Sequence, residues 1–192
     1  MNFHSGGYIH HLGEQPDTFL LDMVHLVEEA FLVLSCMYPQ LAYTLWTKYV
    51  EGRTEKEIAQ TLGVDERSVE RWLNGYRRHD GADIWGAKDY MSRLLQLLAE
   101  AEKLGQLSEV LFLFNMSKGK NFLGVRFCAS IFDILCDAHD KSCLRDFLLF
   151  LQKVKEEKGD SRYLEVLSDL LINWYGKGRL EEFFVSVLRK SA

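Results

Sequence analysis

The chain has 192 residues, 47% of them hydrophobic, and a formal net charge of −5 at pH 7. Such a chain can bury a core in one domain or in two small ones, which excludes a disordered protein. It contains only two prolines, while Leu and Glu are frequent. It therefore predicts an all-α fold, because straight-chain residues keep rotamer freedom in a helix and proline would interrupt it.

The first segment, residues 1–15, has no apolar period and predicts a loose tail. It carries His4, His10 and His11, which could bind a metal but form no specific motif. The N-terminus lacks a basic region followed by an apolar run and a small-residue cleavage site. We therefore expect no secretory signal and a cytoplasmic, nucleoid-associated protein.

Two helices are predicted next. The first has Asp17 as its N-cap and ends near Cys36. Its apolar run, Phe19 to Met37, is interrupted by acidic side chains that would be costly in a bilayer. This run therefore predicts a core helix rather than a membrane span. Pro39 suits the first turn of a second helix, which ends near Gly52.

A capping-box sequence follows at Thr54-Glu55-Lys56-Glu57. In such a box the threonine hydroxyl accepts a hydrogen bond from the backbone N–H of Glu57. The glutamate in turn accepts one from the backbone N–H of Thr54. The sequence therefore predicts that a helix begins here.

The residues after the capping box predict a sharp turn into a second short helix. Ile58, Ala59 and Leu62 lie on one face of the first helix. Gly63 can adopt the left-handed conformation that ends a helix, and Asp65 can cap the next one. Two short helices are therefore expected to meet at a tight turn.

The run from Thr54 to Asn74 resembles the helix-turn-helix family of DNA-binding modules. Transcription regulators, transposases, promoter-reading regions of sigma factors and phage small terminase subunits share this module. Besides the capping box of Thr54 and Glu57, the resemblance rests on a small residue in the first helix, a glycine turn and inward apolar residues. These residues are Ala59, Gly63, Val64, Val69 and Trp72.

The resemblance implies that the second helix, roughly Glu66 to Gly75, lies in the major groove of double-stranded DNA. Arg67 and Arg71, one turn apart, could each bind guanine, and Asn74 could bind adenine. Flanking basic residues could contact phosphates. The complete set of candidate DNA-binding residues is Arg53, Lys56, Arg67, Ser68, Glu70, Arg71, Asn74, Arg77 and Arg78.

The charge of this region supports DNA binding weakly. Between Arg53 and Arg78 there are six basic and five acidic residues, whereas the rest of the chain has an acidic excess. Glu66 and Glu70 place negative charge on the expected reading face, where they would repel phosphates unless they pair with an arginine or accept from cytosine.

The stretch from Tyr76 to Gly86 contains two glycines and is the predicted boundary between two domains. Residues 16–80 would form the helix-turn-helix domain and residues 86–192 a bundle of five or six helices. The apolar stripes at 107–114, 144–154 and 180–188 exceed what a small bundle needs. We therefore expect the C-terminal half to form homo-oligomers or to dock a partner protein.

Other chemistry is weakly indicated. Cys128, Cys136, His139 and Cys143 could bind zinc, but the Cys-x-x-Cys spacing is missing, and packing of reduced thiols in a core is favoured. No phosphate-binding loop, nucleophile motif or metal-binding helix motif is present. The sequence therefore predicts neither an enzyme nor a cofactor.

Two functions remain open. The favoured one is a sequence-specific DNA-binding protein, either a transcription regulator or a DNA-recognition subunit of a phage or mobile-element machine. The alternative is a non-enzymatic adaptor whose helix-turn-helix and acidic helical bundle bind a partner protein. A DNA-binding protein should expose Arg67, Arg71, Arg77 and Arg78 together, whereas an adaptor should bury them or pair them with acids.

Overall fold

A computed structural model describes residues 18–115, 121–158, 161–179, 182–183 and 185. These residues form helices and one small antiparallel sheet, which confirms the all-α prediction. The predicted tail, residues 1–15, and most of the predicted helix 180–188 lie outside the described residues. The elements are α1 (Thr18–Met37), α2 (Pro39–Tyr49), α3 (Glu55–Leu62), α4 (Glu66–Asn74), β1 (Tyr76–Arg77), β2 (Asp83–Ile84), α5 (Ala87–Lys103), α6 (Leu107–Asn115), α7 (Asn121–Asp140), α8 (Leu144–Lys158) and α9 (Ser161–Gly176).

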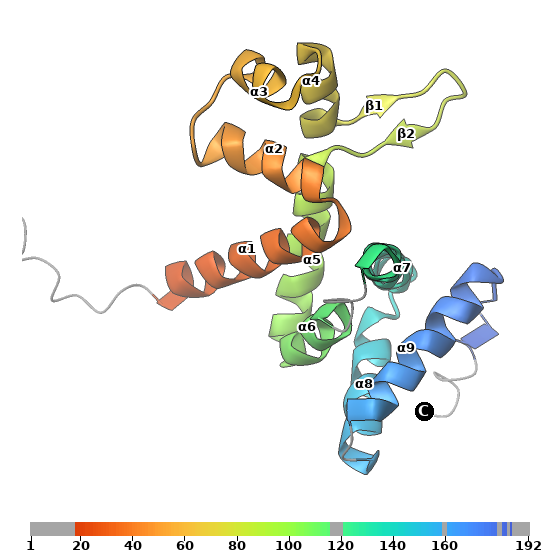
Figure 1. Cartoon of the computed structure of the whole chain (residues 1–192). Helices are drawn as coiled ribbons and strands as arrows, with labels where there is room; N and C mark the ends of the chain where they lie inside the picture. The colour runs from red at the N-terminus through yellow and green to blue at the C-terminus, as the bar shows by residue number, and fades with distance from the viewer. Residues whose placement is uncertain (1–17, 116–120, 159–160, 180–181, 184, 186–192) are drawn as a thin grey trace, which may run out of the picture.

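The helices are arranged around α5, which links the two ends of the molecule (Figure 1). At one end α3 and α4 lie on α2, and the β1–β2 hairpin projects beside them. At the other end α6, α7, α8 and α9 pack together. One hydrophobic core joins buried residues of α1 and α2, such as Leu34 and Ala42, to those of α5, α6, α7 and α8. The division at residues 80–86 stays a prediction, but the helix pair before the motif shares its core with the helices after it.

A second, smaller core holds the two motif helices together. Ile58, Ala59, Val69 and Leu73 are buried there. Leu45 of α2 packs against both cores, so α2 is the support on which α3 and α4 rest. The motif helices therefore have a hydrophobic core of their own and a fixed attachment to the body.

The predicted boundary stretch, Tyr76 to Gly86, contains a β-hairpin. Tyr76 pairs with Ile84 and Arg77 with Asp83 in antiparallel register. The loop closes with a hydrogen bond of 2.8 Å from the Arg78 N–H to the Ala82 carbonyl. Strands of two residues are too short to show the alternation that identifies a strand in sequence, so the sequence did not predict the hairpin.

Two glycines hold the base of the hairpin against the motif. Gly75 follows α4 with a φ of 73°, a conformation that favours glycine. Gly86 precedes α5, and a Cβ atom there would lie 2.7 Å from backbone atoms of Asn74. The end of α4 and the start of α5 are therefore in backbone contact, and this contact fixes the direction in which the hairpin leaves the motif.

Most of the apolar residues at 107–114 and 144–154 that the structure describes are buried. Leu107, Val110, Leu113 and Phe114 of α6 lie in the main core, as do the buried apolar residues of α8. Several helices converge on these stripes and leave little of them uncovered, although Leu149 stays 42% exposed. Self-association of the C-terminal half stays a prediction without this support.

Candidate nucleic-acid interface

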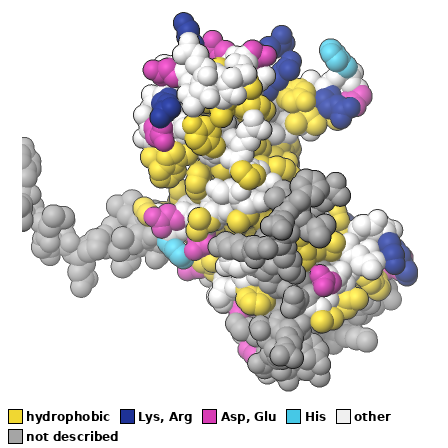
Figure 2. Space-filling model, viewed as in Figure 1, with side chains coloured by type: hydrophobic (Ala, Val, Ile, Leu, Met, Phe, Trp, Pro, Cys, Tyr) yellow, Lys and Arg dark blue, Asp and Glu magenta, His cyan; other side chains and the backbone are white. Residues whose placement is uncertain are grey.

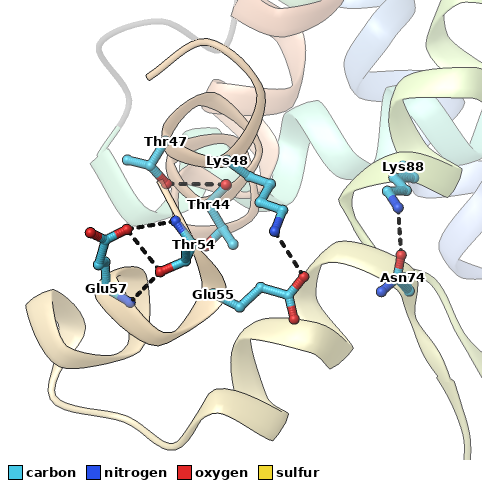
Figure 3. A network of polar contacts seen from close by, with 8 residues as sticks. All are labelled: Thr44, Thr47, Lys48, Thr54, Glu55, Glu57, Asn74 and Lys88. Carbon is cyan, nitrogen blue, oxygen red and sulfur yellow. Dashed lines mark hydrogen bonds and ion pairs between the residues drawn. The ribbon is translucent and has the colours of Figure 1, made fainter. Parts of the chain in front are cut away.

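The start of α3 contains the predicted capping box (Figure 3). The N–H of Thr54 donates to Oε2 of Glu57 at 2.7 Å, and the N–H of Glu57 donates to the Thr54 hydroxyl at 3.3 Å. The hydroxyl also donates to Oε2 of Glu57 at 2.8 Å. The ion pair between Lys48 and Glu55, at 3.1 Å, ties this helix to α2. The first motif helix is thus fixed by local hydrogen bonds and by one contact with its support.

We expect Thr54→Ala to lower the free energy of unfolding by about 1 kcal/mol, the usual cost of removing a threonine N-cap. Thr61→Ala is the matched control, because the Thr61 hydroxyl only bonds back to the Glu57 carbonyl within an exposed helix. Urea titrations of both variants measure the difference. Equal stabilities for the two variants would mean that the capping box contributes nothing.

The capping box also has a pH dependence with a definite sign. The hydrogen bonds from the Thr54 backbone and hydroxyl lower the pKa of Glu57. A lowered folded-state pKa gives a stabilisation that is present above the unfolded pKa of about 4.3 and is lost as the pH falls through the folded one. The stability gap between wild type and Thr54→Ala should therefore narrow in strong acid.

The turn between α3 and α4 has the predicted glycine geometry. Gly63 has a φ of 67° and a ψ of 32°, and no atom within 4 Å would contact a Cβ there. Glycine is favoured at this position by its conformation and not by lack of space. Asp65 then caps α4 by accepting from the Ser68 N–H at 2.6 Å, and this bond lowers the pKa of Asp65.

The inward face of α4 follows the resemblance closely. Val69 is fully buried, while Val64 and Trp72 are half-buried against the small core together with Leu62. Leu73, which was not among the predicted motif residues, is buried too. Leu73 could have been identified from the sequence, because an apolar residue four positions after Val69 lies on the same face of the helix. The two helices therefore pack together through these residues, with Trp72 at the edge of the core.

The outward face of α4 carries the two arginines that were expected to read bases. Arg67 and Arg71 are exposed, and neither forms an ion pair with a described acidic side chain. The guanidinium of Arg71 lies 5.1 Å from the ring centre of Tyr76, the first residue of β1. This cation–π contact orients Arg71 while leaving it accessible to solvent. Glu70 is exposed on the same helix, and Ser68 is half-buried at the cap.

Asn74 is less free than the sequence suggested. Its side-chain oxygen accepts from Nζ of Lys88 in α5 at 2.7 Å (Figure 3). Lys88 also lies over the ring of Tyr49 at 5.5 Å, so it joins α2, α4 and α5. An adenine contact by Asn74 would have to displace this lysine or use the remaining amide group. Lys88 is a basic residue at the interface that sequence reasoning missed, because it lies 14 residues further along the chain.

The flanking basic residues are exposed but partly paired. Arg77 lies 3.7 Å from Asp83, and Arg78 lies 3.1 Å from Asp80. Arg53 pairs with Glu51 at 2.8 Å, whereas Lys56 on α3 is exposed. The four arginines whose exposure was expected to distinguish a DNA-binding protein from an adaptor are therefore all exposed. The two in the hairpin are paired with acids. Exposed ion pairs contribute little free energy, so phosphate groups could replace these carboxylates.

The basic side chains of the motif and the hairpin lie at one end of the molecule. Lys and Arg side chains project over α3, α4 and the hairpin tip, with Asp and Glu between them (Figure 2). Residues 47–84 match the homeodomain-like domain. This homeodomain-like domain starts in α2 and includes α3, α4 and the hairpin. The chain therefore contains a DNA-binding helix-turn-helix.

The homeodomain-like domain accounts for a minority of the chain, and α5 to α9 lie beyond it. No curated protein and no solved structure matches the chain. The role of helices α5 to α9 therefore has to be inferred from their own residues.

The cysteines of α7 and of the turn before α8 are packed as apolar side chains. Cys128 and Cys143 are buried and Cys136 is half-buried, and burial raises the pKa of the Cys136 thiol to about 11. Among the described residues, no three His, Cys, Asp or Glu side chains are grouped so that they could hold a metal ion. None of the described helices is long and apolar enough to cross a membrane.

Proposed function

We propose that the chain is a sequence-specific DNA-binding protein whose helix α4 lies in the major groove of double-stranded DNA. The observation that carries this proposal is the exposed pair Arg67 and Arg71 on the face of α4 opposite its buried residues. Each guanidinium can donate two hydrogen bonds to one guanine, and the helix spacing sets the distance between the two contacts. Lys56 and Arg53 lie at the start of α3, where a phosphate contact would fix the orientation.

The hairpin extends the contact along the DNA backbone. It leaves the motif directly after α4 and carries Arg77 and Arg78 at its far end. Its base is held by the backbone contact between Asn74 and Gly86. Because the hairpin and α4 are joined in this way, the hairpin arginines would contact phosphates next to the base pairs that α4 reads.

The finer role proposed here is a transcription regulator or a DNA-recognition subunit of a phage or mobile-element machine. Selection from a random genomic DNA library, followed by sequencing of the retained fragments, tests it. Enrichment of one sequence motif is expected. Retention of fragments without a shared motif, or of none, would instead favour the adaptor, with α3 and α4 serving protein contacts.

We expect the double variant Arg77→Ala, Arg78→Ala to weaken binding similarly for all DNA sequences. Phosphate contacts carry no sequence information. Each lost contact should also make the negative slope of log K against log salt concentration shallower by about 1. Fluorescence anisotropy at several salt concentrations measures both quantities. A changed sequence preference with an unchanged salt slope would place the hairpin arginines on bases instead.

A further inference from the structure

The side-chain amide of Asn74 is held in one orientation by a lysine from another helix. Nζ of Lys88 donates a hydrogen bond of 2.7 Å to the side-chain oxygen of Asn74 (Figure 3). An ammonium group can only donate, so its partner has to be the amide oxygen and not the amide nitrogen. The Nδ2 amino group of Asn74 is therefore turned away from Lys88.

Lys88 is itself fixed by its surroundings. It is the second residue of α5, and its ammonium group lies 5.5 Å from the ring centre of Tyr49 in α2. The start of α5 abuts the end of α4, because a Cβ atom on Gly86 would lie 2.7 Å from backbone atoms of Asn74. The Gly86 N–H also donates to Asp89 at 2.9 Å, which caps the helix. The fold therefore determines the position from which the lysine reaches Asn74.

Asn74 belongs to the face of α4 that carries the reading arginines. Arg67, Arg71 and Asn74 follow one another at spacings of four and three residues, which places them on one side of a helix. All three side chains are exposed, whereas Val69 and Leu73 are buried on the opposite face. The orientation of the Asn74 amide therefore decides which hydrogen-bonding groups the end of α4 offers to a base.

The contact with Lys88 changes what Asn74 can recognise. Asparagine binds adenine through both of its polar atoms, because the oxygen accepts from N6 while the amino group donates to N7. Both atoms must then face the same base, but the oxygen of Asn74 faces Lys88 and α5. A donor is what remains for DNA. Guanine matches it, since its major-groove edge presents two acceptors, O6 and N7, and no donor.

We propose that Lys88 is a positioning residue that makes Asn74 bind guanine rather than adenine, an inference that rests on the proposed function. Lys88 holds the oxygen of Asn74 toward α5, and Asn74 donates from Nδ2 to O6 or N7 of a guanine. The motif alone predicts adenine, because the lysine lies 14 residues further along the chain. The base pair next to the end of α4 is therefore G·C.

Selection from random DNA with the full chain and with Asn74→Ala locates this base pair, since only that position should lose its preference. The wild type should enrich G·C there. Replacement by A·T should weaken binding by roughly 5- to 150-fold, the range for one mismatched pair. Asn74→Asp keeps an oxygen for Lys88 but lacks the donor, so it should reject the guanine. Enrichment of A·T by the wild type, or an unchanged preference in Asn74→Asp, would overturn the proposal.

Variants of Lys88 separate positioning from charge. Lys88→Met leaves the amide free to turn and should shift the selected pair from G·C to A·T, whereas Lys88→Arg keeps a donor and should retain G·C. Lys103→Met is the matched control, because it removes one positive charge from the exposed end of the same helix. It should leave the motif unchanged. A uniform loss of affinity in Lys88→Met with an unchanged motif would overturn the positioning role.

Nuclear magnetic resonance tests the contact without DNA. The side-chain amide signal of Asn74, assigned by its absence in Asn74→Asp, should show restricted motion in the wild type and free motion in Lys88→Met. Equal mobility in the two chains would overturn the positioning role. A chain that selects a motif which no Asn74 variant changes would refute this inference alone. A chain that selects no motif would refute the proposed function, and the guanine contact with it.

Discussion

Gly86→Ala should be among the most destabilising single substitutions in the homeodomain-like region, with a loss of about 3 kcal/mol. The added Cβ would lie 2.7 Å from two backbone atoms of Asn74, and it would also overlap Gly75. Backbone atoms cannot rotate away as a side chain can, so α4 and α5 would have to separate. That separation would change the direction in which the hairpin leaves the motif.

Thermal and urea unfolding of Gly86→Ala measure this effect. Gly176→Ala is the matched control, because no atom lies within 4 Å of its added Cβ and it ends helix α9. The control should keep or slightly raise stability, since alanine is the better helix former by about 1 kcal/mol. If both variants melted with the wild type, the close contact at the hairpin base would be absent in solution.

The second large effect is expected from the double variant Arg67→Ala, Arg71→Ala. Each arginine that binds one guanine through two hydrogen bonds contributes about 1–3 kcal/mol of discrimination, or roughly 5- to 150-fold in affinity. Removal of both should abolish preference for the selected motif while leaving salt-sensitive, unspecific binding. Both side chains are exposed, so we expect the fold to survive.

The control for this experiment is Arg145→Ala, which removes one positive charge from the exposed surface of α8, outside the homeodomain-like domain. Arg71→Lys provides a second comparison, because lysine keeps the charge but lacks the planar fork that binds guanine. It should retain unspecific binding and lose specificity only at the base pair that Arg71 reads. Selective binding that persists in Arg67→Ala, Arg71→Ala would show that α4 is not the reading helix.

The helix-turn-helix could be predicted in detail because its signals are local. The capping box of Thr54 and Glu57 spans one helical turn, and the left-handed turn at Gly63 depends on its own backbone. The apolar period that buries Val69 arises within a single helix. In each case the interacting groups are a few residues apart, so the sequence alone contained the information.

The neighbourhood of the reading face could not be predicted in the same way. Lys88 reaches Asn74 from a different helix, and the aromatic residue beneath Arg71 belongs to the hairpin. The hairpin itself has strands of two residues, below the length at which alternation is visible. Whether an apolar stripe is covered depends on the helices that reach it, as the burial of Leu113 and Phe147 illustrates.

The sequence by itself determined the helical fold class, the two motif helices, their turn and the arginines that α4 presents. These follow from helix propensity, capping and residue spacing, which act within one or two turns. The tertiary structure alone decided which apolar surface stays open. It buried most of the predicted stripes at 107–114 and 144–154 and left Trp46 and Val50 exposed beside the motif. The physical reason is that the burial of a stripe depends on the helices that pack against it. A helical period indicates that an apolar stripe needs a packing partner, but it does not identify that partner.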